Sequence, residues 1–319
     1  MAYTGTGDVS SDTAAFQQLA YFAFRSQPMY EMIADVRSTA QTHNGASVQF
    51  NIYDNMAQAT SALTEASDVT AVALGDSTVV VTLAEYGNAV ITTAKLRGTS
   101  FLNVDADAAN IIGYNMVDSV DKLVSNVANA GTNVIYAQGS AGSRPASRVA
   151  VSDANTFGAQ EGRQAVAELR TASAPGFENG NYIGLVHPDV SYDLREQTAV
   201  TDVIQYQIRQ EGAAVRNGSI GVFGGIEWIE NPRAPILDDA GATGTTNVYQ
   251  TLVAGRQALA KAFSRAPGFG EDPSVVFGPV TDTLRRFHPV GWYHLVGHAI
   301  FRQAALQRIE SSSSIGDNT

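Results

Sequence analysis

The 319-residue sequence contains no cysteine, which excludes disulfide bonds, cysteine-ligated zinc and a thiol nucleophile. Lysine is scarce as well, because Lys95, Lys122 and Lys261 are the only three among 20 cationic residues. No apolar run approaches the roughly 18 residues that a membrane-spanning helix needs. Even the most apolar stretch, residues 79–94, carries Glu85. We therefore expect a soluble protein without a membrane partner.

Charged residues make up only 16% of the chain, against about 25% in a typical globular protein. The net charge is -11 and the pI is about 4.8, which argues against a protein whose main surface tracks nucleic-acid phosphates and leaves a local basic patch open. Two explanations of the low charge stay open. Either neighbouring subunits cover much of the surface, or a GC-rich genome biases the composition toward Ala, Gly and Arg.

The first 37 residues predict a helix followed by an extended arm. Ser11 and Asp12 supply a cap signal, and Pro28 ends the helical spacing. The residues up to 16 contain neither a basic nor an apolar signal-peptide region, so we expect assembly in a cytosol. The segment is also rich in aromatic residues, too many for one helical face, and some must pack on another element or chain: Phe16, Tyr21, Phe22, Phe24 and Tyr30.

Residues 46–94 predict two β-strands joined by a long polar loop. Val48, Phe50 and Ile52 alternate with polar residues in the first strand, and the second places Val79, Val81 and Leu83 on one face. A two-stranded hairpin is marginal in water unless a third surface covers its apolar face. The pattern leaves two possibilities: a neighbouring chain provides that surface, or the strands belong to an internal sheet.

Residues 103–131 give the clearest helix, with Ile112, Met116 and Val120 among apolar residues that recur every three or four positions. Asp105 is a candidate cap and Gly131 a candidate left-handed stop. Such a helix is about 35 to 40 Å long. A Gly-, Ser- and Pro-rich stretch at 137–147 marks a domain boundary, and beyond it strands and helices alternate, with 248–263 compatible with either. Residues 291–301 alternate in a strand-like pattern, and we predict a strand there.

The segment "YIGLVHPDVSYDLREQ", residues 182–197, is the densest in ionisable groups. We interpret it as a buried strand, a turn at Pro188 and a helix capped by Asp189. A hydrolase using His187 with Asp189 or Ser191 is the competing hypothesis, but the G-x-S-x-G motif of a nucleophile elbow is absent. The structural interpretation is favoured, and no catalytic residue is predicted.

Two further patterns suggest binding sites and are disfavoured on spacing. His294 and His298 lie in a strand-like stretch, where residues four apart are about 13 Å from each other, too far to share one metal ion. Residues 216–225 are glycine-rich but lack the Lys-Ser/Thr of a phosphate-binding loop. We predict no metal site and no cofactor, and interpret these glycines as turns.

Three motifs occur in a recognisable order: "YIGLVHPDVSYDLR", then "GSIGVFGGIEWIENP", then "VGWYHLVGHAIF". Together they resemble the major capsid proteins of tailed bacteriophages, in the branch typified by phage N-four. That fold is shared with encapsulins and the herpesvirus capsid floor. The resemblance extends from about residue 48 to about residue 308.

The resemblance implies an α+β fold in four parts. An N-terminal arm would occupy 1–45, and an extended β-hairpin loop that lies over a neighbouring subunit would occupy 46–95. A peripheral domain would combine 96–135, with a spine helix at 105–130, and 281–319. An axial α/β domain would occupy 136–280.

The resemblance also implies a structural, non-enzymatic subunit of the virion. Pentamers and hexamers of this chain would form an icosahedral shell around double-stranded DNA, assembled in the cytoplasm of the bacterial host. Implied partners are the chain itself, a portal, a decoration or minor capsid protein, and packaged DNA by non-specific proximity. A scaffolding protein is expected to be separate, because no long charged helical segment precedes the arm. An encapsulin-like cargo shell is the alternative within the same fold.

Self-assembly contacts are expected from the apolar residues of the arm and of the two strands. The candidates are Phe16, Phe22, Phe24, Phe50, Ile52, Val79, Val81 and Leu83. Covalent crosslinking through Lys and Asn, known in some relatives, is not expected here, with Lys95 the sole plausible donor.

Overall fold

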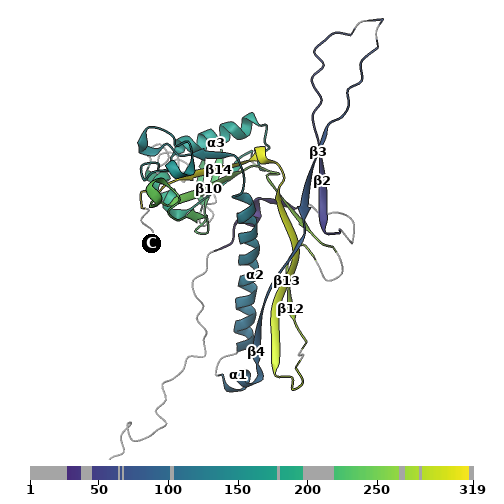
Figure 1. Cartoon of the computed structure of the whole chain (residues 1–319), viewed down its shortest axis with the longest axis vertical. Coiled ribbons are helices and arrows are strands. Elements are labelled where there is room, and N and C mark those ends of the chain that lie inside the picture. Colours follow the sequence, from purple (N-terminus) through teal and green to yellow (C-terminus); the bar gives the residue numbers. More distant parts are fainter. Residues whose placement is uncertain are drawn as a thin grey trace, which may run out of the picture.

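A computed structural model shows a compact part beside an elongated part, from which a long loop projects (Figure 1). We call the loop residues 54–75, beyond the last strand pair, the outer loop. None of the helices in the described part of the chain has the length and apolar character needed to cross a membrane. The structure describes residues 27–36, 45–63, 65–66, 68–100, 104–177, 180–196, 219–265, 270–279 and 282–315.

The elongated part contains helix α2 (Val104–Ala128) and a five-stranded sheet, and the helix lies along the sheet (Figure 1). The central strand, β13 (Phe287–Ile300), pairs along one edge with β4 (Ala84–Thr93). Its other edge pairs with two strands in succession, β12 toward the start of β13 and β11 toward its end. The remaining bounds are β1 Ala34–Val36, β11 Leu259–Phe263, β12 Ser274–Phe277 and the short helix α1 Ala94–Thr99.

The compact part contains a seven-stranded sheet in the order β5-β14-β10-β6-β8-β7, with β9 paired to β10. Its core includes Trp228 and Phe157, whose rings meet edge to face at 5.5 Å. Gly184 on the neighbouring strand leaves room for the Trp228 ring, because a Cβ there would lie 2.5 Å from it. The strands are β5 Val134–Tyr136, β6 Tyr182–Val186, β7 Ser219–Phe223, β8 Ile226–Glu230, β9 Ile236–Leu237, β10 Val248–Ala254 and β14 Leu306–Ser311; the helices are α3 Ala159–Thr171 and α4 Pro188–Glu196.

A separate hairpin of β2 (Ser47–Tyr53) and β3 (Asp76–Thr82) carries the outer loop. The two strands pair from Ser47 opposite Thr82 to Tyr53 opposite Asp76. Short 3-10 helices complete the fold at Tyr30–Ile33, Gly139–Ala141, Arg148–Ala150, Ala242–Gly244 and Gln303–Ala305.

Several predicted elements are confirmed, and their ends differ in detail. The predicted long helix is α2, but Asp105 lies in its first turn instead of capping it, and Gly131 does not adopt a positive φ. Residues 248–263 form two strands and no helix, because Gln257, with φ 66°, belongs to a tight turn between them. The strand predicted at 291–301 corresponds to β13, which begins at Phe287 and ends at Ile300.

The division of the chain into four domains remains a prediction. Two strands pair with strands that the division assigns to another domain. β14, within 281–319, pairs with β10 of the compact part. β11, within 136–280, pairs with β13 of the elongated part. The chain therefore passes between the two parts more often than the sequence division implies.

The arm segment nearest the body is anchored by buried contacts. Tyr30 is fully buried, and its backbone N–H donates to Oδ1 of Asp121 on α2 at 2.6 Å. β1 pairs in parallel with β11. The ammonium of Lys261 on β11, whose side chain is 3% exposed, forms an ion pair with Glu31, which is 43% exposed. Displacing this segment would leave the Lys261 charge buried without its carboxylate.

We expect Glu31→Ala to destabilise the unassembled subunit by about 1–2 kcal/mol, because the Lys261 charge then stays buried without its carboxylate partner. The loss is moderate because the ion pair is only half buried. The double variant Glu31→Ala/Lys261→Met is expected to recover most of that loss, because no charge then remains buried. Thermal melting monitored by circular dichroism measures both. Equal melting temperatures for wild type and Glu31→Ala would contradict the anchoring role.

Candidate self-assembly interface

Five of the candidate interface residues lie on one face of the β2–β3 hairpin. Val81 and Leu83 are buried, while Phe50, Ile52 and Val79 are partly exposed and pack beside them. The other three candidates, Phe16, Phe22 and Phe24, lie outside the described residues.

The third surface that this hairpin needs is supplied by the chain itself. The small side chains of Ala260 and Ala262 on β11 lie beneath the hairpin, and Phe301 contacts Phe50 edge to face at 6.2 Å. Gly297 on β13 permits the approach, since a Cβ there would clash with the backbone oxygen of Thr82. A neighbouring chain is therefore not required to cover this face, and a role for these residues in contacts between subunits stays a prediction.

The outer loop and its flanks expose large apolar side chains that the sequence patterns did not single out. The loop extends away from both parts of the molecule (Figure 1). In the isolated chain such side chains are hydrated at a cost of about 25 cal/mol per Å² of apolar surface, which favours their burial against another molecule. The exposed fractions are Tyr53 70%, Met56 58%, Leu63 77%, Val69 60%, Val72 65% and Leu74 69%.

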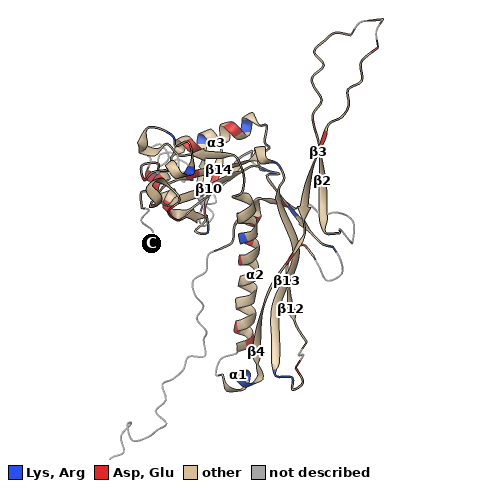
Figure 2. Ribbon diagram, in the orientation of Figure 1, with Lys and Arg blue, Asp and Glu red and all other residues tan. Residues whose placement is uncertain are grey.

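The charged residues of the outer loop and its flanks are all acidic. The sequence has no Lys or Arg between Arg37 and Lys95, while the outer loop and its flanks carry Asp54, Glu65, Asp68 and Asp76. Figure 2 shows acidic residues on the loop and basic residues at the opposite end of the elongated part. A surface that binds this loop is therefore expected to be apolar and free of acidic side chains.

A cluster of ionic groups joins α2 to the compact part. Arg233, which follows β8, forms ion pairs with Asp118 and with Asp121, the latter at 3.1 Å. Burial raises the pKa of Asp121, and the hydrogen bond from Tyr30 and the charge of Arg233 counteract that rise. One carboxylate thus connects the arm, the long helix and the compact part.

The ionisable segment around His187 ties one helix to two strands. The Ser191 hydroxyl lies 2.6 Å from Oε1 of Glu230 on β8, and the Tyr249 hydroxyl of β10 donates to Asp189 at 3.0 Å. His187 lies 3.3 Å from Asp189, and burial lowers its pKa. Ser191 is thus directed at Glu230, and these contacts connect α4 to the sheet. The predicted strand and helix are β6 and α4, but α4 begins at Pro188, so Asp189 lies in its first turn instead of capping it.

The two histidines of the disfavoured metal motif lie on β13, as predicted, facing the interior with Lys261 of β11. Burial and the charge of Lys261 lower the pKa of His294, and they lower the pKa of His298 to about 4. The described residues contain no group of three or more His, Cys, Asp or Glu suited to a metal ion. Of the glycine-rich stretch, Gly224 and Gly225 form the predicted turn, with φ of 65° and 88°.

The His298 environment predicts acid sensitivity. In the unfolded chain His298 has the usual histidine pKa of about 6.5, whereas burial in the folded protein lowers its pKa to about 4. The free energy of unfolding should therefore fall as the pH drops from about 6.5 to 4. His298→Gln should make the fall shallower over the same window, measured by urea unfolding at several pH values. Identical pH profiles for the two proteins would contradict this account.

The fold combines a long helix along an elongated sheet with a compact α/β part and a projecting hairpin, and solved phage capsids share it. The chain is similar to the capsid of Ralstonia phage GP4, with 13% identity and a TM-score of 0.76 over 100% of both chains. It is also similar to the capsid of cyanophage Pam1 (14%, TM-score 0.73, 99% of both chains) and to that of cyanophage P-SCSP1u (18%, TM-score 0.72, 98% of this chain and 96% of that one). At these identities the likeness shows the fold.

The family itself is shown by sequence. The family model described as phage capsid protein matches residues 6–310, and the chain belongs to that family. No curated protein matches it. The protein is accordingly a structural, non-enzymatic subunit that associates with copies of itself in the shell of a virion.

Proposed function

We propose that this subunit closes into pentamers and hexamers, which assemble into an icosahedral shell around double-stranded DNA. The observation that carries the proposal is the outer loop, which exposes apolar side chains far from the body while the hairpin beneath it is already packed in its own chain. Head-to-tail contacts between identical subunits close into rings. Several modest contacts per subunit then give a stable shell through multivalency.

In this proposal each segment of the chain has its own role in assembly. Residues 1–45 act as an arm, with Phe16, Phe22 and Phe24 as contact residues, and 46–95 as the loop that reaches a neighbour. The elongated part is peripheral, and the compact part, largely 136–280, is axial and packs around the ring centre. The hairpin residues Phe50, Ile52 and Val79, which are only partly buried, remain candidates for additional contacts.

Charge supports an inner surface that does not bind DNA tightly, since the subunit carries a net charge of -11. Assembly would take place in the cytoplasm of a bacterial host, with a separate scaffolding protein, a portal and a decoration or minor capsid protein as partners. Lys95 is exposed on α1, and we propose that it forms no crosslink, so that mature particles yield intact monomers on a denaturing gel.

Sedimentation velocity with electron microscopy tests the proposal on the purified chain, alone and co-expressed with its phage scaffolding protein. Particles of megadalton mass that contain five- and six-membered rings are expected. A chain that stays monomeric or dimeric under both conditions would overturn the proposal. Shells filled with a cargo enzyme and free of DNA in infected cells would favour the encapsulin-like alternative.

Shortening the outer loop should abolish shell assembly while the subunit still folds. We expect replacement of residues 55–74 by Asn-Gly to leave the melting temperature of the subunit within a few degrees, because a two-residue turn suits the paired strands below it. The same variant should form no closed shells. The control is Asp68→Asn, which keeps the loop length. Normal shells from the shortened chain would contradict the role given to the loop.

A further inference from the structure

A polar pocket lies where the C-terminal half of α2 adjoins the compact part, and we call it the junction pocket. It has a volume of about 650 Å³, which falls in the range of small-molecule sites, roughly 300–1,000 Å³. Helix α2 contributes Lys122, Asn126 and Asn129 to its lining, and the compact part contributes Arg148 and the segment 232–238. A ligand in this pocket would therefore contact both parts of the molecule.

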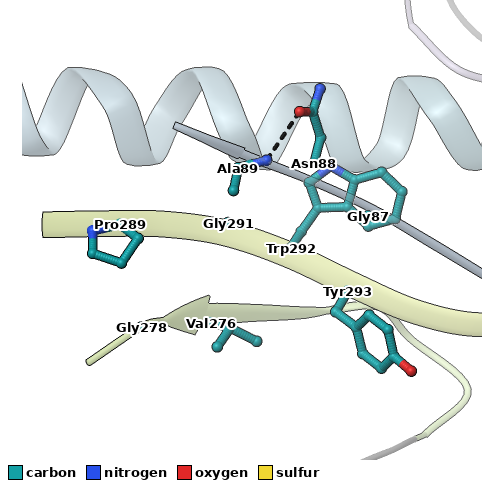
Figure 3. Close-up of a pocket in the computed structure, with 9 residues that line it drawn as sticks. All are labelled: Gly87, Asn88, Ala89, Val276, Gly278, Pro289, Gly291, Trp292 and Tyr293. Carbon is teal, nitrogen blue, oxygen red and sulfur yellow. Dashed lines mark hydrogen bonds between the residues drawn. The ribbon is translucent and has the colours of Figure 1, made fainter. Parts of the chain in front are cut away.

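The junction pocket differs in charge from the groove on the elongated sheet. That groove lies between β4, β13 and β12, and the described residues that line it carry no charge (Figure 3). The lining of the junction pocket includes three cationic side chains, Lys122, Arg148 and Arg233, and one carboxylate, Asp238. This local excess of positive charge contrasts with the net charge of -11 of the whole chain. It favours an anionic ligand.

The two arginines of the lining are held in place by carboxylates. Arg148 donates from Nε to Oε2 of Glu310 at 2.9 Å and from Nη2 to Oε1 at 2.6 Å. Neither bond uses its Nη1, for which the described part of the chain supplies no acceptor. Arg233 pairs with Asp118 and Asp121, which are not part of the lining. Side chains that are already fixed lose little conformational entropy when they bind a ligand.

The carboxylate of Glu310 is shared by two arginines. Besides Arg148, Nε of the buried Arg308 lies 3.0 Å from Oε1 of Glu310, which also accepts from Gln250 at 3.1 Å. Burial raises the pKa of Glu310, but the hydrogen bond from Arg148 and the charges of both arginines outweigh burial and hold the pKa below its usual range. Within the described ranges the two arginines have no other carboxylate at ion-pair distance. One positive charge is thus uncompensated in a partly buried cluster, which favours binding of an anion.

Lys122 adds an unpaired cation from α2. It is exposed, and no carboxylate among the residues that the structure describes lies within ion-pair distance of its ammonium. Its acidic neighbours in sequence, Asp118 and Asp121, pair with Arg233 instead. Asn126, one turn further along α2, adds an amide that can donate to the same ligand. The wall formed by α2 thus offers donors that face no competing carboxylate.

We propose that the junction pocket binds a phosphate-type oxyanion. Lys122 and Arg148 donate charge-assisted hydrogen bonds to its oxygen atoms, and Arg233 adds positive charge to the lining. Free phosphate is the expected source, because the net charge of -11 disfavours a nucleic-acid strand. The bound anion connects α2 to the compact part and stabilises the folded subunit, since it binds only the folded state. This inference goes beyond the proposed function, because it concerns the unassembled subunit and requires no shell.

Calorimetric titration of the unassembled subunit with sodium phosphate tests the proposal, at an ionic strength held constant with sodium chloride. We expect saturable binding that is about tenfold weaker in Lys122→Met, since that variant lacks one charge-assisted hydrogen bond. The matched control is Lys95→Met, which removes an exposed lysine on α1 and should bind phosphate as the wild type does. Equal phosphate affinity of the wild type and Lys122→Met would overturn the inference.

Titration with a short oligothymidylate distinguishes the two sources of phosphate. Weaker binding of the oligonucleotide than of phosphate would support the free anion as the ligand. Tighter binding of the oligonucleotide, with the same loss in Lys122→Met, would support the pocket and assign it to a nucleic-acid backbone. Saturable binding of neither probe would refute the site.

Arg148→Met gives an independent readout by thermal melting. Glu310 then keeps Arg308 and Gln250 as partners, so this variant is expected to fold. Phosphate should raise the melting temperature of the wild type and of Lys95→Met, and should leave that of Arg148→Met unchanged. An equal rise in all three proteins would show that phosphate acts elsewhere on the subunit. Neither measurement involves shells, so failure of the proposed function would leave this inference standing.

Discussion

Strand β13 is the element on which the rest of the structure depends. Its fourteen residues are hydrogen-bonded along both edges, to β4 on one side and to β11 and β12 on the other. One of its faces meets α2, and the opposite face supports the hairpin that carries the outer loop. At about 3.3 Å per residue it spans about 46 Å, so it fixes the length of the elongated part. The distance between the loop at one end and the basic residues at the other follows from it.

The surface suited to assembly, the outer loop, exposes large apolar side chains. The loop is acidic, but the large side chains that it exposes are those of Met, Leu and Val. Ionic groups are used mainly inside the subunit, where Arg233 ties α2 to the compact part and Glu31 compensates the buried Lys261. This division matches a chain with few charged residues, since exposed ion pairs add little affinity and fully desolvated apolar contacts add more.

Elements with a strong local pattern were predictable from sequence. The alternation of Val79, Val81 and Leu83 gave β3, and the spacing of Ile112 and Val120 gave α2, because burial on one face leaves a period in the sequence. What covers the hairpin was not predictable, since Ala260 and Phe301 lie about two hundred residues away and carry no pattern that points to it.

A cryo-electron microscopy reconstruction of the assembled particle tests the central claim most directly. The account predicts a closed icosahedral shell of five- and six-membered rings, in which density for residues 54–75 of one subunit contacts a neighbouring subunit. A particle without such rings, or one in which the loop contacts no neighbouring subunit, would contradict it.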